Sequence, residues 1–368
     1  MSGSAASLAN AATRALRAYD PGHDLPALRR RFGSVLAELG SNENSLGPSP
    51  LALAAIRDAL PEIFRYPDPA GGALKAALAK HLRVDAAQIT LGNGSHELLM
   101  LIAQCFADAG TSVVFSEFGF AVFPIATAAA GAQPVRVPAL PRNHRAQPLG
   151  HDLDALATAV RADTRIVYLA NPNNPTGTWF GDAELAAFLA RVSPTTLVVV
   201  DEAYHEFVDD PALTSALRFL PEYPNLIVTR TFSKAYALAG LRVGYAVSSL
   251  HAAAVLERLR ESFNVNILAL AAATAALGDQ DHVACAKAFN LAERTWLAAQ
   301  LENRGLRVLP SQTNFVLVDF ARDAAAIESA LFDRGVIVRP MGGYGLSEFL
   351  RISVGSRAEN ERLLEALP

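Results

Sequence analysis

Several features that would assign a protein class at once are absent from this sequence of 368 residues. It contains only two cysteines, Cys105 and Cys285, which lie far apart and exclude both a disulfide framework and a cysteine-based zinc site. No run reaches the ~18 consecutive apolar residues that a membrane-spanning helix needs. Lys and Arg number 32 against 36 Asp and Glu, so the net charge is −4, and no basic excess exists to attract nucleic acid or an anionic membrane.

Three further absences narrow the choice. No Gly-x-Gly-x-x-Gly motif follows a first strand with an acidic residue at the expected distance, which disfavours a dinucleotide-binding enzyme. The eight histidines show no spacing typical of a metal site, so we expect no metal. The N-terminal segment from Met1 to Leu16 lacks the continuous apolar run of a signal peptide. Together with the scarcity of cysteine, this favours a cytoplasmic protein.

The residues that are present indicate a large folded core. Hydrophobic residues make up 51% of the chain and charged residues 18%, and the length allows two or three domains. Short Val- and Ile-rich runs alternate with helical patterns, which predicts an α/β domain with a mostly parallel central sheet covered by helices on both faces. The predicted strands are Ser112–Phe115, Arg165–Ala170, Leu197–Val200, Leu226–Thr229 and Val243–Val247.

The pattern changes after about residue 260, where a long Ala-rich helical stretch, Leu268–Leu301, precedes shorter helix and strand patterns. We predict a smaller α+β domain there. The predicted organisation is an N-terminal arm over residues 1–45, a large domain over residues 46–262 and a small C-terminal domain over residues 263–368.

Polar and ionisable residues follow three of the predicted strands. Asn171–Gly177 comes after the first of them, Asp201–Tyr204 after the second and Arg230–Lys234 after the third. In an open parallel sheet, ligands bind beyond the carboxyl ends of the strands. An amide, a carboxylate, a phenol and an amine are therefore expected to meet at one edge of the sheet.

One of the four lysines differs from the others. Lys75, Lys80 and Lys287 lie on predicted amphipathic helices, whereas Lys234 comes just after an apolar strand. Desolvation at that place lowers the pKa of an amine and makes it a nucleophile that can form a Schiff base, which arginine cannot do. The alternative interpretation is a surface lysine in a loop.

The surroundings of Lys234 favour the first interpretation. Asp201 ends a buried strand, where a carboxylate needs a cation such as a pyridinium nitrogen. Gly92–Ser95 leads into a helix whose N–H groups can hold a phosphate, and Arg242 can add a bidentate contact. Together these residues describe a site for a phosphorylated aldehyde cofactor.

These residues also resemble the motifs of a known family. Asn171–Gly177, Asp201–Tyr204 and Thr231–Lys234 are similar to the signature of the fold-type I pyridoxal 5′-phosphate aminotransferases, and the resemblance covers nearly the whole chain. Four more segments resemble the histidinol-phosphate branch: Ser41–Asn44, Arg65–Asp68, Gly92–Ser95 and Phe349–Gly355. The resemblance implies a transaminase of histidine biosynthesis that interconverts L-histidinol phosphate plus 2-oxoglutarate and imidazole acetol phosphate plus L-glutamate.

The resemblance also implies a role for each candidate residue around the cofactor, pyridoxal 5′-phosphate. Lys234 binds it as a Schiff base and moves a proton, Asp201 pairs with the pyridine nitrogen, and Tyr204 bonds the ring hydroxyl. The remaining cofactor-binding residues that it implies are Ser95, His96, Phe118 (stacked on the ring), Asn174, Thr231, Ser233 and Arg242.

The same resemblance places substrate and partner contacts. Arg351 is implied to grip the anionic group of the substrate, with Arg339, Tyr19 and Asn174 at the same end of the pocket. Tyr66 is implied to reach the cofactor phosphate of a neighbouring subunit, so a homodimer is expected. The remaining partners are a small-molecule amino donor and a keto acceptor.

Two positions depart from the family pattern. His96 stands where the family usually has Asp or Asn, and Ser116-Glu117 replaces the common Pro-Thr. The second departure keeps open an aromatic amino acid aminotransferase. The sequence also leaves open a decarboxylase on the same fold and a cofactor-binding module of a transcription regulator. The regulator module needs a helix-turn-helix domain, and the roughly forty residues before the core motifs carry no such pattern.

Overall fold

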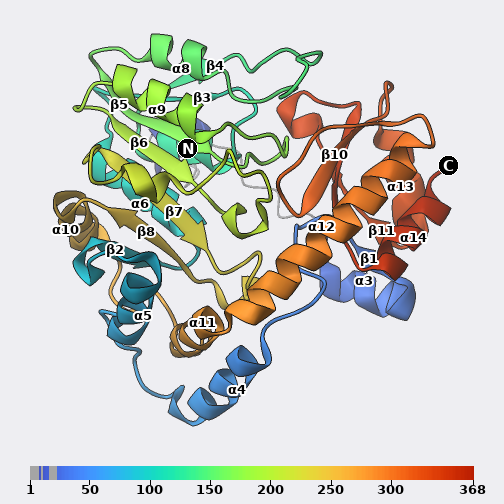
Figure 1. The fold of residues 1–368 in the computed structure, drawn as a ribbon, viewed down its shortest axis with the longest axis horizontal. Helices are drawn as coiled ribbons and strands as arrows, with labels where there is room; N and C mark the ends of the chain where they lie inside the picture. The colour runs from blue at the N-terminus through green and yellow to red at the C-terminus, as the bar shows by residue number, and fades with distance from the viewer. Residues whose placement is uncertain (1–7, 10, 16–22) are drawn as a thin grey trace, which may run out of the picture.

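The computed structural model describes residues 8–9, 11–15 and 23–368, and a seven-stranded sheet forms the centre of its larger part (Figure 1). The strand order is β2-β8-β7-β6-β5-β3-β4. Strands β3, β4, β5, β6 and β7 run parallel to one another, and β8 is antiparallel to both of its neighbours. The strands are β2 (Ile89–Gly92), β3 (Ser112–Ser116), β4 (Gln133–Val137), β5 (Thr164–Ala170), β6 (Leu197–Asp201), β7 (Leu226–Thr231) and β8 (Gly244–Ser248).

Helices cover both faces of this sheet because its central strands are apolar on both sides. In β6, Val198 and Val200 pack into the core on one face, and Val199 packs into the core on the other. One face is covered by α5 (Gly72–Leu82), α8 (Leu153–Ala159), α9 (Asp182–Arg191) and α11 (Ile267–Gly278). Helix α4 (Pro50–Ala59) packs on α11. The other face is covered by α6 (Ser95–Phe106), α7 (Val122–Ala129) and α10 (Leu250–Leu259).

The C-terminal part contains a second, antiparallel sheet of four strands in the order β12-β13-β10-β9. Its strands are β9 (Arg307–Val308), β10 (Phe315–Asp319), β12 (Arg339–Pro340) and β13 (Phe349–Ser353). Its helices are α12 (Gln280–Glu302), α13 (Ala325–Asp333) and α14 (Arg357–Ala366).

The N-terminal segment joins this C-terminal part. Strand β1 (Ala37–Glu38) pairs in parallel with β11 (Val336–Ile337). Figure 1 shows β1 and α3 (Leu25–Phe32), in blue, beside the red elements β11 and α14. A further short helix, α2, spans Ala11–Ala15. After β1, residues 39–49 lead from the C-terminal part to α4. We call residues 39–49 the crossing segment, because they run between the two parts of the molecule.

The structure confirms the predicted alternation of strands and helices and changes two details. The Ala-rich stretch Leu268–Leu301 is not one helix: α11 ends at Gly278, and the Asp279 carboxylate caps the start of α12 by accepting from the backbone N–H of His282. Strands β2 and β4 were not predicted. β2 has the sequence Ile-Thr-Leu-Gly, which lacks the continuous Val- and Ile-rich run of the predicted strands. β4 is an edge strand and carries Pro134 and exposed residues.

Within the part of the chain that the structure describes, no helix combines the length and the apolarity needed to cross a membrane.

Candidate active site

A cavity of about 960 Å³ opens where the carboxyl ends of the parallel strands meet the C-terminal part. The large sheet contributes Asp201 from the end of β6 and Thr231 from the end of β7. The opposite wall is formed by Arg339 on β12 and Arg351 on β13, and the crossing segment contributes Gly40–Glu43. Three regions distant in sequence therefore enclose one space.

A carboxylate and an amine share the floor of this cavity. Asp201 is only 4% exposed and accepts a hydrogen bond from the Thr229 hydroxyl at 2.8 Å. Burial raises the pKa of Asp201 to about 7, with the nearby Glu202 carboxylate adding to the shift. Burial lowers the pKa of Lys234 to about 7, and the charges of Arg351 and Arg242 push it in the same direction. The amine can therefore lose its proton near neutral pH, as a nucleophile or a base must.

One corner of the cavity is built to hold an anion. Ser95 begins α6 there, so the unpaired N–H groups and the positive end of the helix dipole face the cavity. The Arg242 guanidinium donates to the Ser233 hydroxyl at 3.3 Å, and Thr231 and Ser233 are linked at 2.9 Å. His96 also lines this corner, where burial and the charge of Arg242 lower its pKa.

The Tyr204 hydroxyl lies at the centre of a group of amides. It accepts from Asn42 Nδ2 at 2.9 Å and from Asn174 Nδ2 at 3.3 Å. Lys234 Nζ lies 5.8 Å from the centre of the Tyr204 ring and donates to the carbonyl of Ser41 at 3.1 Å. The amine and the phenol are thus held over the same part of the floor.

The wall facing the C-terminal part carries cations. Arg351 donates to Asn174 Oδ1 at 2.7 Å and to the carbonyl of Gly40 at 2.8 Å, and its guanidinium lies over the Phe315 ring. Arg339 lines the same wall, and Arg136 of β4 also borders the cavity. Guanidinium groups in such a wall suit a small anionic molecule.

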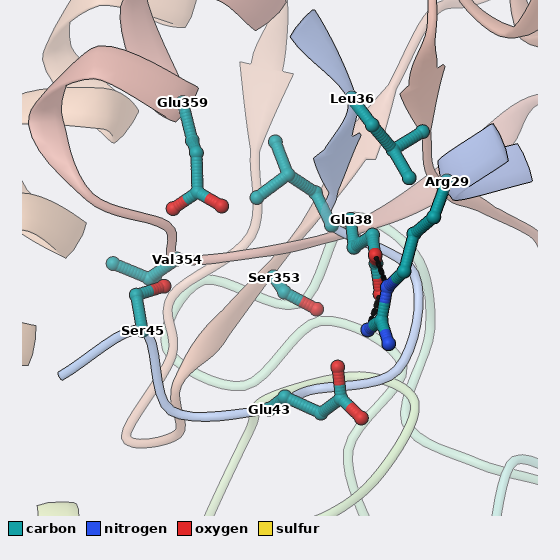
Figure 2. A pocket seen from close by; sticks show the side chains of 9 residues that line it. Arg29, Leu36, Glu38, Glu43, Ser45, Ser353, Val354 and Glu359 are labelled. Atoms are coloured by element: carbon teal, nitrogen blue, oxygen red, sulfur yellow. Dashed lines mark hydrogen bonds and ion pairs between the residues drawn. The ribbon is translucent and has the colours of Figure 1, made fainter. Parts of the chain in front are cut away.

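A second, smaller cavity of about 230 Å³ lies behind the crossing segment (Figure 2). Figure 2 shows Arg29 bonded to Glu38, with Glu43 and Ser353 facing the same space. Glu43 borders both cavities, so the crossing segment is the wall between them. Among the described residues, no group of three or more His, Cys, Asp or Glu side chains is placed to hold a metal ion.

The chain matches known proteins along nearly its whole length. Residues 35–367 match the family Aminotransferase class I and II. Histidinol-phosphate aminotransferase 2 of Pseudomonas aeruginosa is 50% identical over 363 residues, which is 98% of this chain and 96% of that protein. Histidinol-phosphate aminotransferase 1 of Thiobacillus denitrificans is 48% identical over 96% of this chain and 91% of its own length.

The chain belongs to the class I and II aminotransferases, among the histidinol-phosphate aminotransferases. The solved structures agree with this membership and with its fold-type I architecture. Histidinol-phosphate aminotransferase from Sinorhizobium meliloti, in complex with pyridoxal 5′-phosphate, has a TM-score of 0.88 and 37% sequence identity, covering 98% of this chain and 97% of its own.

In this aminotransferase, most of the candidate residues named from the sequence line one cavity. The residues that the structure brings together are Ser95, His96, Asn174, Asp201, Tyr204, Thr231, Ser233, Lys234, Arg242, Arg339 and Arg351. They come from elements up to about 250 residues apart, which is why spacing alone does not reveal their proximity.

Three candidates lie elsewhere or cannot be placed. Phe118 does not line the cavity: it is 8% exposed and packs with Leu309, Met341 and other apolar residues in a separate cluster. Tyr66 is 82% exposed and stacks on Phe263 at 4.7 Å, away from the cavity of its own chain. Tyr19 lies outside the described residues.

Sequence reasoning missed three residues that the structure brings to the cavity. Phe120, two positions after Phe118, lines it with its ring edge-on to Phe123. Asn42 stands out in the sequence only as part of a family motif, yet its side chain contacts Tyr204, 162 residues away. Arg136 had no signal at all, because an exposed arginine on an edge strand is ordinary in sequence.

Proposed function

We propose that this aminotransferase moves an amino group between L-histidinol phosphate and 2-oxoglutarate, giving imidazole acetol phosphate and L-glutamate, with pyridoxal 5′-phosphate as cofactor. The observation that carries the proposal is the meeting of the Lys234 amine, the buried Asp201 carboxylate and an anion-binding helix end in one cavity whose far wall carries arginines. The names of its 48–50% identical relatives support this choice of substrate.

The residues in the cavity fit the proposed cofactor. Burial is the main cause of the raised pKa of Asp201, and a protonated ring nitrogen beside this carboxylate would stabilise its charged form. At Gly94, a Cβ atom would come within 2.4 Å of Arg242 Nη2, so only glycine lets this arginine close over the helix end. Ser95, Ser233 and Arg242 would hold the cofactor phosphate there.

When bound, pyridoxal 5′-phosphate supplies the electron sink that makes a carbon-bound proton of an amino acid acidic. The chain supplies the groups around that chemistry. Lys234, with its pKa near 7, takes and returns the proton at its Nζ atom. Asp201 holds the ring nitrogen in its charged form, and Tyr204 and Asn174 bond the ring oxygen. We assign the ring-stacking position to Phe120 instead of Phe118, because Phe120 borders the cavity and Phe118, two positions earlier, does not.

Arg351 and Arg339 form the end of the cavity that binds the anionic group of the substrate. In one half of the reaction this group is the glutamate α-carboxylate, and in the other it is the substrate phosphate. Arg351 is pre-oriented by its bonds to Asn174 and the Gly40 carbonyl, which reduces the ordering required when the substrate binds.

The proposal includes a homodimer in which Tyr66 reaches the partner's site. Its support is an exposed apolar surface on and after α4 that one chain leaves uncovered. This surface consists of Leu51, Leu53, Leu60, Ile63, Phe64 and Tyr66. The division into an arm (1–45), a large domain (46–262) and a small domain (263–368) stays part of the proposal, and the two separate sheets support it. Because α11 packs on the large sheet, the boundary between the two domains falls after α11 and not at residue 262. The two free cysteines support a cytoplasmic location.

The first test replaces Lys234 by alanine. We expect the visible absorbance of lysine-bound pyridoxal phosphate to vanish and turnover to fall by roughly 10²–10⁴-fold or more, because both the nucleophile and the base are lost. Lys80→Ala, at an exposed position on α5, is the control and should change neither. Persistence of both signals in Lys234→Ala would refute the assignment.

Substrate comparison separates the proposed function from its alternatives. Amino transfer from L-histidinol phosphate to 2-oxoglutarate, with only slow transfer from phenylalanine, supports the proposal. A large preference for phenylalanine identifies an aromatic amino acid aminotransferase instead. Release of carbon dioxide without formation of glutamate identifies a decarboxylase.

A further inference from the structure

Two side-chain amides converge on the oxygen of Tyr204. Asn42 Nδ2 lies 2.9 Å from it and Asn174 Nδ2 lies 3.3 Å from it. Asn42 is 1% exposed and comes from the crossing segment, whereas Asn174 comes from the loop after β5. An amide N–H₂ group can only donate, so in this arrangement the phenol oxygen accepts from both.

The direction of both amides is set by two residues of β13. Arg351 can only donate, so its bond at 2.7 Å identifies the Asn174 atom that it contacts as the oxygen. The Ser353 oxygen accepts the backbone N–H of Asn42 at 2.8 Å, and the Ser353 hydroxyl donates to Asn42 Oδ1 at 3.1 Å. In both cases the oxygen of the amide is taken, and its N–H₂ group points at Tyr204.

The backbone of Asn42 is held as firmly as its side chain. Its φ angle is +56°, a left-handed conformation that asparagine tolerates better than most residues. Its carbonyl accepts from Asn314 Nδ2 at 3.0 Å, just before β10. Asn42 is therefore fixed by the C-terminal sheet while its side chain reaches a residue of the large sheet.

We propose that Asn42 is a positioning residue that, oriented by Ser353, makes the Tyr204 hydroxyl a hydrogen-bond donor toward the cofactor's ring oxygen. With two donors on the phenol oxygen, the hydrogen bond that Tyr204 itself can make is a donated one. Donation from Asn42 also polarises the phenol and strengthens the bond that it donates. The inference rests on the proposed function, because it assumes that pyridoxal phosphate occupies the cavity.

The test follows the pH midpoint of the visible absorbance change of bound pyridoxal phosphate. A donor to the ring oxygen stabilises its anionic form and weakens its hold on the neighbouring proton, so loss of the donor raises the midpoint. We expect Tyr204→Phe to raise it by roughly one pH unit. Asn42→Gly keeps the positive φ available and removes only the side chain; it should raise the midpoint by a smaller amount. Ser353→Ala should shift it in the same direction.

A double-mutant cycle decides whether Asn42 acts through Tyr204. Asn42→Gly should have no effect on the midpoint when Tyr204→Phe is already present. The control is Asn225→Ala, a buried asparagine that donates to the Thr196 carbonyl at the opposite ends of the strands; it should lower stability and leave the midpoint unchanged.

Three results would overturn the inference. The first is a midpoint equal to that of the wild type in both Asn42→Gly and Ser353→Ala. The second is an Asn42→Gly shift of the same size with and without Tyr204→Phe, since Asn42 would then act by another route. The third is a wild-type protein that shows no lysine-bound cofactor absorbance, which removes the proposed function as well and is thereby distinguished from the first two.

Discussion

At the scale of single residues, burial shifts the pKa values of Asp201 and Lys234 on the cavity floor in opposite directions. It favours the neutral form of each, so the pKa of Asp201 rises to about 7 and that of Lys234 falls to about 7. Neither group suits a closed protein core. Both suit a space that a charged molecule fills, which is the physical reason to regard this pair as functional.

Asp201→Asn is predicted to stabilise the cofactor-free protein above neutral pH. Because the pKa of Asp201 is higher in the folded than in the unfolded chain, the folded state loses stability as pH rises from about 4 to about 7. We expect the variant to be more stable than the wild type by up to about 4 kcal/mol at pH 8 and nearly equal to it at pH 4. Urea unfolding of the cofactor-free proteins at both pH values measures this.

Addition of pyridoxal phosphate provides the control for that prediction. The cofactor should stabilise the wild type more than the variant, because only the wild-type carboxylate gains a cationic partner. A wild type that is more stable than Asp201→Asn without cofactor at pH 8 would contradict the account.

At the scale of elements, the side chains of the cavity are positioned by the ends of strands and the start of a helix. β6 and β7 are adjacent and parallel, so Asp201 and Thr229 lie side by side and the hydroxyl of one strand orients the carboxylate of the other. The turn before α6 places a helix N-terminus beside Arg242. On β13, Arg351 and Ser353 point to the same side because side chains two apart share a face of a strand.

Gly94→Ala tests the turn before α6. Gly94 has φ +89°, and a Cβ atom there would meet the Arg242 guanidinium, so the arginine must move from the helix end. We predict roughly tenfold to hundredfold weaker binding of pyridoxal phosphate, measured by titration of the cofactor-free protein.

Gly131→Ala is the matched control for that change. Gly131 has φ +75°, but a Cβ atom there would meet nothing within 4 Å. Both variants should lose stability from backbone strain, and Gly94→Ala should lose more, by roughly 1–3 kcal/mol, because its ψ of 165° with a positive φ is essentially restricted to glycine. Only Gly94→Ala should change cofactor affinity. Equal affinities in the two variants would show that Arg242 does not need its observed position.

At the scale of the whole molecule, the cavity exists only because the C-terminal part closes over the strand ends of the large sheet. The crossing segment separates this cavity from the smaller one shown in Figure 2 and connects both parts through Asn42. The exposed apolar surface on and after α4 is the surface that we propose a second chain covers. Tyr66 is exposed on this surface and does not line the cavity of its own chain. In the proposed homodimer, a second copy covers the surface and receives Tyr66 in its cavity.

Hybrid dimers test the crossing of Tyr66. Lys234→Ala and Tyr66→Ala proteins are each expected to have low activity. When the two are mixed under conditions that allow subunit exchange, activity should rise, because one site of each hybrid contains both an intact Lys234 and an intact Tyr66. Measured turnover after mixing checks this, and mixing Lys234→Ala with Asp201→Asn is the control.

That control also shows what is expected when two residues belong to the same site of one chain. Lys234 and Asp201 line the same cavity of one chain, so each site of their hybrid carries one defect and no activity returns. Tyr66 acting within its own chain would likewise give no recovery in the first mixture, which would contradict the crossing.

The sequence by itself determined the layered α/β architecture and the chemical character of the site. Val- and Ile-rich runs such as Leu197–Val200 form strands because burial on both faces favours them, and the polar residues after them must then meet at one sheet edge. Lys234 and Asp201 were predictable for that reason. The Ser49-Pro50 pair is typical of a helix start, and in the structure the Ser49 hydroxyl accepts the backbone N–H of Leu51 at the start of α4.

Only the tertiary structure decided which side chains turn into the cavity. Phe118 and Phe120 have the same character in sequence, and the packing of Phe118 against Leu309 and Met341 leaves Phe120 at the cavity. Asn42 and Ser353 are 311 residues apart, and no local pattern predicts their hydrogen bonds to each other. Such contacts depend on how two sheets dock, and docking is set by the whole buried surface, not by any single segment.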